Sequence, residues 1–401
     1  MSARPATKSA IDCSSAWPER RNAADQGNFR FYDNRQKYLM FVNTCSEKWM
    51  VAERAAKELS SLKPSPPALR FFDAGIGDGT VLSRVMRAMH ARFPRLPFYI
   101  AGKEISLEDV RLTLDKMPDR LFEHPETVLA ITNISYADAP WLVPSKPETR
   151  SRMVWKAVPL TGDTTAAFER QMLELQPFLT ANWRTHASGK TGALLPDVPT
   201  TLILYREDHA FLLDSVIPRL ETVQADFDLV LASQPFRLRA SAAFKAQRVL
   251  APLACALRPG GRLLGIHSAG NDPGLEIIQL VWPGENPFVG SRRELLDATR
   301  RALGNASVAF RFDALANAES LFRYDLHTLP DEVDAEAASI GTSTLLAAWN
   351  AATYVAQIED ERLAAAMGNS SYLDATRQVL RKHGELWFND ESYVIAREPA
   401  R

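Results

Sequence analysis

The sequence predicts an α/β fold in which helices flank an open, largely parallel sheet, and three observations support this. Short apolar segments alternate with segments at helical spacing from residue 67 onward, as in βαβ units. Some apolar segments are continuous runs, such as "FDLVLAS" (227–233), which suit strands buried on both faces. A glycine-rich turn, "AGIGDGT" (74–80), follows the first predicted strand, and such sheets bind ligands at the carboxyl ends of their strands.

The expected elements follow from this alternation. Helical spacing at 30–59 predicts one or two helices before the sheet, and "SSLKPSPP" (60–67) is a proline-broken linker. The first half of the sheet is then predicted as strands 68–75, 96–104 and 127–135 with helices 81–93 and 107–117. The second half is predicted as strand 227–233, helix 242–257, a turn at "RPGG" (258–261), strand 262–268, helices 291–303, 345–358 and 371–384, and strand 385–398.

Residues 140–222 interrupt this rhythm and are too long for a simple connection between a strand and a helix. They include a helix-like segment at 164–183 and a strand-like segment at 200–206. We therefore expect a flexible tail at 1–28, a helical cap at 29–66, a sheet domain at 67–139 and 223–401, and an inserted subdomain at 140–222. Because the insert leaves the sheet after the third strand, near the carboxyl ends of the strands, we expect it to cover the substrate side of any site at that edge.

Composition excludes several classes of protein. The formal net charge of −1 disfavours nucleic-acid binding, which usually needs a basic excess. The three cysteines and seven histidines are scattered, so neither a disulfide framework nor a metal site is expected. There is no apolar stretch of 18 residues and no apolar signal-peptide core. We expect a cytoplasmic enzyme, monomeric or homodimeric, that does not bind membranes.

The glycine turn carries the strongest chemical signal. Asp73 ends a strand, and Gly75, Gly77 and Gly79 follow at alternate positions, where missing Cβ atoms let a ligand approach the backbone. The dinucleotide fingerprint G-x-G-x-x-G does not fit, because its third glycine would fall on Thr80. A purely structural tight turn is the alternative. The G-x-G-x-G spacing after an acidic residue instead resembles motif I of class I S-adenosylmethionine-dependent methyltransferases.

This resemblance implies a Rossmann-like methyltransferase sheet, S-adenosyl-L-methionine as cofactor, and a set of cofactor-binding residues. Glu104, after the second strand, would accept the two ribose hydroxyls, a geometrically selective contact; a solvated strand end is the alternative. The adenine would lie near the end of the third strand, in "NISYADAP" (133–140). The implied cofactor-binding residues are Asp73, Gly75, Gly77, Asp78, Gly79, Glu104, Ser135, Asp138 and Ser233.

Three further segments are similar to the histamine N-methyltransferase family. "FVNTCSE" (41–47) matches its F-x-N-x-x-[ST]-E helix, whose glutamate, here Glu47, contacts the substrate. "ASQPF" (232–236) places Gln234 where the family has a glutamine that hydrogen-bonds the acceptor. The final strand, "LWFNDES" (386–392), is similar to an L-F-N-N strand, with Asn389 and Asp390 at the asparagine pair.

The resemblance implies a small polar acceptor, methylated at an amine nitrogen. Glu47, Gln234 and Asn389 would be catalytic and would contact the acceptor together with Phe236 and Asp390. Asp390 departs from the family's second asparagine, and an aspartate cannot donate a hydrogen bond as an amide does. It would favour a more cationic acceptor, or leave Asn389 to bind the acceptor instead. The bland alternatives are a solvated helix face for Glu47, a helix cap or loop contact for Gln234, and a turn at residues 389–390.

Other functions stay open at this point. "SQPF" (233–236) is similar to the [NDS]-P-P-[FYW] signature of methyltransferases that modify amino groups of bases or a glutamine side chain, although Gln234 replaces the first proline. Methylation of a small molecule at oxygen is a second alternative. A cofactor-binding module without catalysis, in which the insert plugs the acceptor pocket, is a third.

Overall fold

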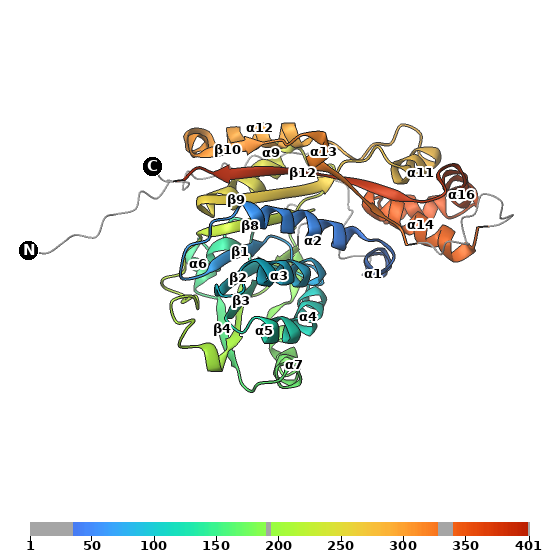
Figure 1. Ribbon diagram of the computed structural model, residues 1–401. Helices are drawn as coiled ribbons and strands as arrows, with labels where there is room; N and C mark the ends of the chain where they lie inside the picture. Colours follow the sequence, from blue (N-terminus) through green and yellow to red (C-terminus); the bar gives the residue numbers. More distant parts are fainter. Residues whose placement is uncertain (1–34, 190–193, 328–339, 400–401) are drawn as a thin grey trace, which may run out of the picture.

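The structure is a computed structural model that describes residues 35–189, 194–327 and 340–399. The tail expected at 1–28 lies outside the described residues. A central sheet runs through the molecule, with helices on both of its faces (Figure 1). The expected α/β fold with a largely parallel sheet is confirmed.

The strands of the central sheet follow a doubly wound order. From one edge to the other they are β10 (Phe310–Asp313), β12 (Trp387–Arg397), β9 (Leu257–Ser268), β8 (Phe227–Ser233), β1 (Leu69–Asp73), β2 (Phe98–Lys103), β3 (Thr127–Thr132), β7 (Thr200–Arg206) and β4 (Val154–Leu160). β11 (Leu321–Asp325) pairs with the first part of β12. The segment β3-β2-β1-β8-β9 is parallel throughout. The order reverses between β1 and β8, and the crevice at this switch point is where open α/β sheets bind ligands.

Residues 140–222 do not form a separate layer. β7 pairs antiparallel with β3, and β4 pairs parallel with β7, so both strands extend the edge of the central sheet. The helix-like segment at 164–183 forms two helices, α7 (Thr165–Leu173) and α8 (Gln176–Asn182), with a proline in the first turn of the second. A small two-stranded sheet, β5 (Thr185–Ala187) and β6 (Leu194–Pro196), follows them.

The predicted turn at 258–261 is wrong, because β9 already begins at Leu257 and passes through these residues with a register shift against β8. A Cβ atom on Gly261 would lie 2.4 Å from the carbonyl oxygen of Phe227, so the glycine permits a close approach of two strand backbones.

Helices cover both faces of the sheet because successive strand side chains point to opposite faces. In β1, Phe71 packs into one core cluster and Phe72 into the other. The cluster that contains Phe71 is covered by α2 (Glu47–Glu58), α3 (Thr80–Arg92), α4 (Leu107–Asp115), α5 (Met117–Glu123), α7 and α8. The other is covered by α9 (Ala242–Lys245), a π-helical turn (Ala246–Leu250), α10 (Ala251–Cys255) and α12 (Arg292–Leu303).

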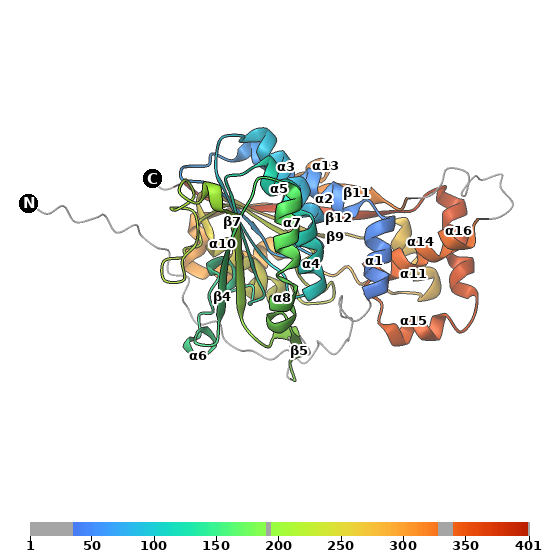
Figure 2. The same ribbon diagram turned by 90° about the horizontal axis from the view of Figure 1, so that it is seen from below.

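A third core cluster lies beyond the end of the sheet (Figure 2). It joins α1 (Arg35–Thr44) to helices from the last third of the chain: α11 (Pro273–Val281), α14 (Thr342–Val355), α15 (Asp360–Ala366) and α16 (Ser371–His383). The remaining short elements are α6 (Pro147–Arg150), α13 (Asn317–Ser320) and 3₁₀ turns at Leu59–Ser61, Ala139–Trp141, Glu207–His209 and Gly304–Ala309. None of the described helices combines the length and the apolar character needed to cross a membrane.

Candidate active site

A cavity opens at the carboxyl ends of β1 and β8, at the switch point of the sheet. One side of it is lined by residues of the glycine turn and the neighbouring strand ends: Asp73, Gly75, Gly77, Glu104, Tyr136 and Ser233. The other side is lined by residues of α1, α2 and α14 and by strand ends: Tyr38, Phe41, Glu47, Gln234, Tyr324 and Tyr354. We call these the turn side and the helix side of the cavity.

Asp73 and Gly75 form the floor of the turn side. Asp73 accepts a hydrogen bond from the Gly75 amide through Oδ1 (3.1 Å), whereas its buried Oδ2 has no partner in the described structure. Burial raises the pKa of Asp73 to about 6. A Cβ on Gly75 would have no neighbour within 4 Å, so the backbone here faces open space. A buried acceptor without a partner beside bare backbone fits a ligand that carries a donor group.

Glu104 lies across the turn from these residues. Its carboxylate accepts the amides of Gly77 through Oε2 and of Ser106 through Oε1, both at 2.8 Å. Burial and the charge of Asp109 raise the pKa of Glu104 to about 7. Each carboxylate oxygen still has a lone pair to offer, so Glu104 can accept two further donors such as vicinal hydroxyls.

Asp78 and Gly79 have structural contacts and do not line the cavity. Asp78 accepts the backbone amide and the hydroxyl of Thr80 at the start of α3, and Lys116 lies 3.6 Å from its Oδ2. Gly79 has φ +78°, and a Cβ on it would lie 2.8 Å from the Cα of Thr113 in α4. Both residues therefore shape the turn and pack it against neighbouring helices.

The expected adenine residues are only partly matched. Ser135 and Asp138 hydrogen-bond each other (3.0 Å), and Asp138 also accepts the amide of Ser145. Neither lines the cavity, which Tyr136 does instead. The ammonium of Lys103 lies 4.7 Å from the centre of the Tyr136 ring. Tyr136 follows Ser135 directly in the sequence, and its ring was the sequence signal to use, because rings commonly border flat ligands.

Glu47 lies on the helix side, at the first residue of α2. The start of this helix is tied to the end of β11, since Ser46 donates its amide to the carbonyl of Asp325 and accepts the Asp325 amide on its hydroxyl. Glu47 is 8% exposed. Burial raises the pKa of its carboxyl, against the opposing charge of Lys48. The alternative of a solvated helix face is therefore wrong for Glu47, which faces the cavity; its contact with a substrate stays a prediction.

Gln234 lines the cavity in a strained backbone conformation, with φ +47°. Its Nε2 donates to Ser268 Oγ (3.0 Å) and to Asp390 Oδ1 (3.2 Å), and its Oε1 accepts the Ser268 amide (3.3 Å). Both amide protons are therefore used within the protein, and one lone pair on Oε1 is left for a donor. Backbone strain of this kind costs about 1–3 kcal/mol and concentrates at ligand sites.

Asn389 and Asp390 point to opposite faces of β12. Asn389 donates through Nδ2 to the carbonyls of Gly270 and Asn271 and does not line the cavity. Asp390 is fully buried, and its Oδ2 has no hydrogen-bond partner in the described structure. Burial first, and then the charge of Glu47, raise the pKa of Asp390 well above its usual value. The structure thus brings Asp390, not Asn389, to Glu47 and Gln234.

Phe236 does not wall the cavity. It is 8% exposed and packs in the core, where the buried ammonium of Lys245 lies 5.0 Å from the ring centre. The aromatic lining comes instead from Tyr38, Phe41, Tyr324 and Tyr354, with Phe41 stacked on Tyr354 at 4.7 Å. No sequence motif indicates Tyr324 or Tyr354, which lie 280 and 310 residues after the end of α1 and meet it only in the folded chain.

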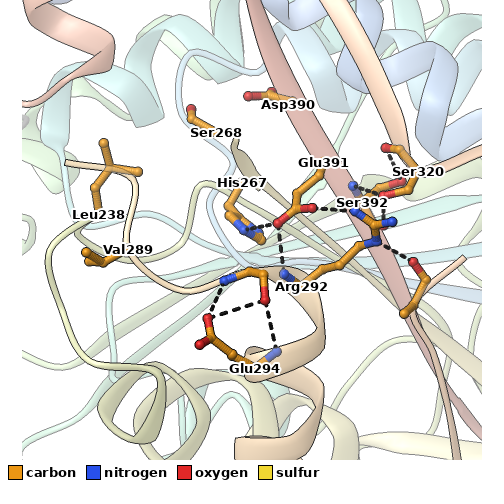
Figure 3. Close-up of polar contacts among 12 residues, drawn as sticks. Leu238, His267, Ser268, Val289, Arg292, Glu294, Ser320, Asp390, Glu391 and Ser392 are labelled. Atoms are coloured by element: carbon orange, nitrogen blue, oxygen red, sulfur yellow. Dashed lines mark hydrogen bonds and ion pairs between the residues drawn. The ribbon is translucent and has the colours of Figure 1, made fainter. Parts of the chain in front are cut away.

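A buried ionic network supports β12 behind the cavity (Figure 3). Glu391 binds Arg292 through Oε2 (2.6 Å) and lies 2.9 Å from His267 through Oε1. The basic neighbours hold the pKa of Glu391 down at about 2, against the effect of burial. Next to it, Ser392 donates its amide to Ser320 and accepts Arg54 Nε (2.9 Å). These contacts fix the strand that carries Asp390.

The insert at 140–222 supports the turn side and does not cover the helix side. Trp183 donates from Nε1 to the carbonyl of Glu104 (2.9 Å). No described residue of the insert lines the cavity, so the expectation that it covers the acceptor side is not met there. The physical reason is topological, because β4 and β7 extend the sheet at the β3 edge, while the switch point lies between β1 and β8.

Solved methyltransferase structures are similar to this chain. They include the Haemonchus contortus phosphoethanolamine N-methyltransferase 2 with S-adenosyl-L-methionine, at 11% identity and TM-score 0.30, covering 93% of this chain and 60% of that chain. The CurJ carbon methyltransferase matches at 8% identity and TM-score 0.35, covering 92% and 60%. The plantazolicin methyltransferase BpumL with S-adenosylhomocysteine matches at 8% identity and TM-score 0.34, covering 92% of each chain.

No protein-family model matches the sequence, and no curated protein matches it. Two of the named structures are described as acting on different atoms, nitrogen and carbon. The finer resemblance to histamine N-methyltransferase stays a prediction.

Proposed function

We propose that the protein is an S-adenosylmethionine-dependent methyltransferase that acts on a small polar molecule at an amine nitrogen. The observation that carries this proposal is that one cavity is lined by Asp73, Gly75 and Glu104 on one side and by Glu47 and Gln234 on the other. The first group has the chemistry of a site for a nucleoside joined to an amino acid, and the second has that of a site for a small cation.

The turn side fits the methyl donor. Glu104 has two free acceptor positions for the ribose hydroxyls, and the partnerless Oδ2 of Asp73 can accept the donor's ammonium. Gly75 has no side chain and faces open space, so the amino-acid part of the donor can pass close to the turn there. The donor, when bound, supplies an electrophilic methyl group on a sulfonium, and its positive charge suits a cavity whose charged lining residues are mostly acidic.

The helix side fits an amine. Glu47 lines the cavity, and Asp390 is buried behind Gln234, to which it is hydrogen-bonded. The charge of Glu47 disfavours ionisation of Asp390, so a cationic guest would relieve the repulsion between the two carboxyls. The rings of Tyr38, Phe41 and Tyr354 add favourable quadrupole contacts for an ammonium. The remaining lone pair of Gln234 Oε1 can fix one N–H of the guest.

Methyl transfer needs a neutral nitrogen, and Glu47 can provide it. With its pKa raised by burial, the Glu47 carboxylate is a better proton acceptor than an exposed one. It would take the proton from the bound ammonium, so that the nitrogen lone pair forms the new N–C bond while the S–C bond breaks. Glu47, Gln234 and the rings would hold this nitrogen in line with the methyl, and orientation of this kind can supply roughly 7–11 kcal/mol.

The proposal is tested with a labelled-methyl donor and a panel of amines, amino acids and phenols. We expect transfer to one or more amines, and we expect Glu47→Gln to lower kcat/KM by roughly 100-fold or more, the usual contribution of a general base. Glu53→Gln is the matched control, because Glu53 is exposed on the same helix. Transfer to phenols alone would show that the enzyme methylates oxygen and would overturn the assignment to nitrogen. Label found only in a macromolecular fraction would overturn the small-molecule assignment.

Methylation of a protein or nucleic-acid amino group through residues 233–236 has less support. That reaction would need the ring of Phe236 to stack on the target group, but the ring is buried in the core.

A further inference from the structure

Lys48 is a cavity residue to which the sequence assigned no role. It follows Glu47 in α2 and lines the cavity beside the glycine turn. A Cβ atom on Gly77 would lie 3.6 Å from its Nζ, so the ammonium lies over the side of the turn that the glycine leaves bare. Within the described part of the chain, Lys48 makes no hydrogen bond or ion pair, and its ammonium lies 5.7 Å from the centre of the Tyr38 ring.

The charges around Lys48 keep it protonated. Burial would lower the pKa of its ammonium, but attraction by the acidic groups around it, Tyr38, Glu47 and Asp78, raises that pKa well above the usual value. Lys48 in turn favours the charged form of Asp73. The cavity therefore contains a protonated lysine with acidic groups around it.

Among the charged side chains that line the cavity, Glu47, Asp73, Glu104 and Asp109 are acidic and Lys48 is basic. The proposed donor has the complementary distribution, since its sulfonium and ammonium are positive and its carboxylate is negative. An anionic group in this cavity would be repelled from every charged lining residue except Lys48. A buried anion needs a partner of opposite charge.

We propose that the ammonium of Lys48 binds the carboxylate of the donor's amino-acid part, next to the bare backbone of Gly77. Asp73 would bind the ammonium of the same amino-acid part. This inference rests on the proposed function, because it assumes the sulfonium donor. It adds a residue of the helical cap to the cofactor site, so that α2 contacts the donor through Lys48 and the acceptor through the adjacent Glu47.

The test compares two ligands that differ by this amino-acid part. S-adenosylhomocysteine has it, whereas 5′-deoxy-5′-methylthioadenosine has the same adenosine and a thioether but no carboxylate. Calorimetry on Lys48→Met should give roughly 10- to 100-fold weaker binding of S-adenosylhomocysteine, as for loss of a charge-assisted hydrogen bond. Binding of methylthioadenosine should stay within about twofold of the wild-type value. Lys48→Arg should recover part of the loss.

Lys57→Met is the matched control, because it removes the same charge from an exposed position of the same helix, about 13 Å further along at 1.5 Å per residue. It should bind both ligands like the wild type. Equal weakening of both ligands by Lys48→Met, or of neither, would overturn the assignment of Lys48 and leave the methyltransferase proposal intact. A folded wild-type protein that binds neither ligand would overturn both.

Discussion

Two glycines of the same turn should respond to alanine in opposite ways. Gly75 faces the cavity, and a Cβ there meets nothing within 4 Å. Gly79 packs on α4, and a Cβ there would lie 2.8 Å from Thr113 Cα and 2.9 Å from Thr113 Oγ1. We therefore predict that Gly75→Ala weakens cofactor binding in a protein that stays stable, and that Gly79→Ala destabilises the protein.

The cost of Gly79→Ala has two parts. At φ +78° a non-glycine residue is strained by about 1–2 kcal/mol. The new methyl group also collides with the backbone of α4, which cannot turn aside as a flexible side chain would, and overpacking of this kind costs about 1–3 kcal/mol. Together they lower the free energy of unfolding by about 2–5 kcal/mol.

Gly75→Ala should behave differently, because Gly75 has no positive φ and its Cβ would have room. Restricting the unfolded chain stabilises such a variant by up to about 1 kcal/mol. The methyl group would, however, occupy space needed by the donor's amino-acid part. We expect S-adenosylhomocysteine to bind at least about 10-fold more weakly, equivalent to about 1.4 kcal/mol.

Urea unfolding without ligand and calorimetry with S-adenosylhomocysteine separate the two effects. Wild-type affinity in Gly75→Ala would show that the donor does not cross the turn, and would refute the placement of the cofactor. Wild-type stability in Gly79→Ala would show that the packing against Thr113 is not tight.

Three further substitutions test the site and its supports. Glu104 must be ionised to accept two hydroxyls, and its pKa is raised to about 7. The affinity of the wild type for the donor should therefore rise as pH rises through about 7. Calorimetry on Glu104→Gln should show weaker binding that does not depend on pH in this range. Glu391→Gln should lower the free energy of unfolding in urea by about 3–5 kcal/mol, because Arg292 is left as a buried charge. The pKa of Glu391 is depressed from 4.5 to about 2, so its contribution is complete above about pH 4.5 and is lost as pH falls through about 2. Trp183→Phe should lower that free energy by about 1–3 kcal/mol, because the carbonyl of Glu104 loses its buried donor.

The fold could largely be predicted from the sequence where its signals are local. β2, β3 and β8 each contain a run of four apolar residues, and helices between successive strands predict the parallel pairing that the sheet has. The missed elements lack such signals. β4 is half exposed, with a proline near its end, as edge strands allow. The chain order of 140–222 suggested a separate subdomain, but pairing with β3 is a long-range contact with no local signature.

The candidate site divides in the same way. Residues of the turn side come from one contiguous βαβ region, so a motif could indicate Asp73, Gly75, Gly77 and Glu104, all of which line the cavity. The helix side is assembled from both ends of the chain, and Tyr324 and Tyr354 carry no motif. The strand register of β12 decided the choice between Asn389 and Asp390, because a shift of one residue exchanges the faces of a strand.

Asp390→Asn tests whether the buried acidic pair is adapted to a cation. A carboxyl whose pKa is raised on folding destabilises the protein as pH rises above its unfolded value of 3.8, since ionisation is then opposed in the folded state. The amide removes this penalty and keeps a carbonyl oxygen for Gln234. Urea unfolding should therefore show Asp390→Asn to be more stable than the wild type near neutral pH, with a difference that shrinks as pH falls toward about 4.

The same variant should change the site. The pKa of Glu47 should fall with loss of its acidic neighbour, and KM for cationic amines should rise more than KM for neutral acceptors. If the variant is less stable than the wild type at every pH, the carboxyl of Asp390 stabilises the free protein, and the buried acidic pair is not adapted to a cationic ligand.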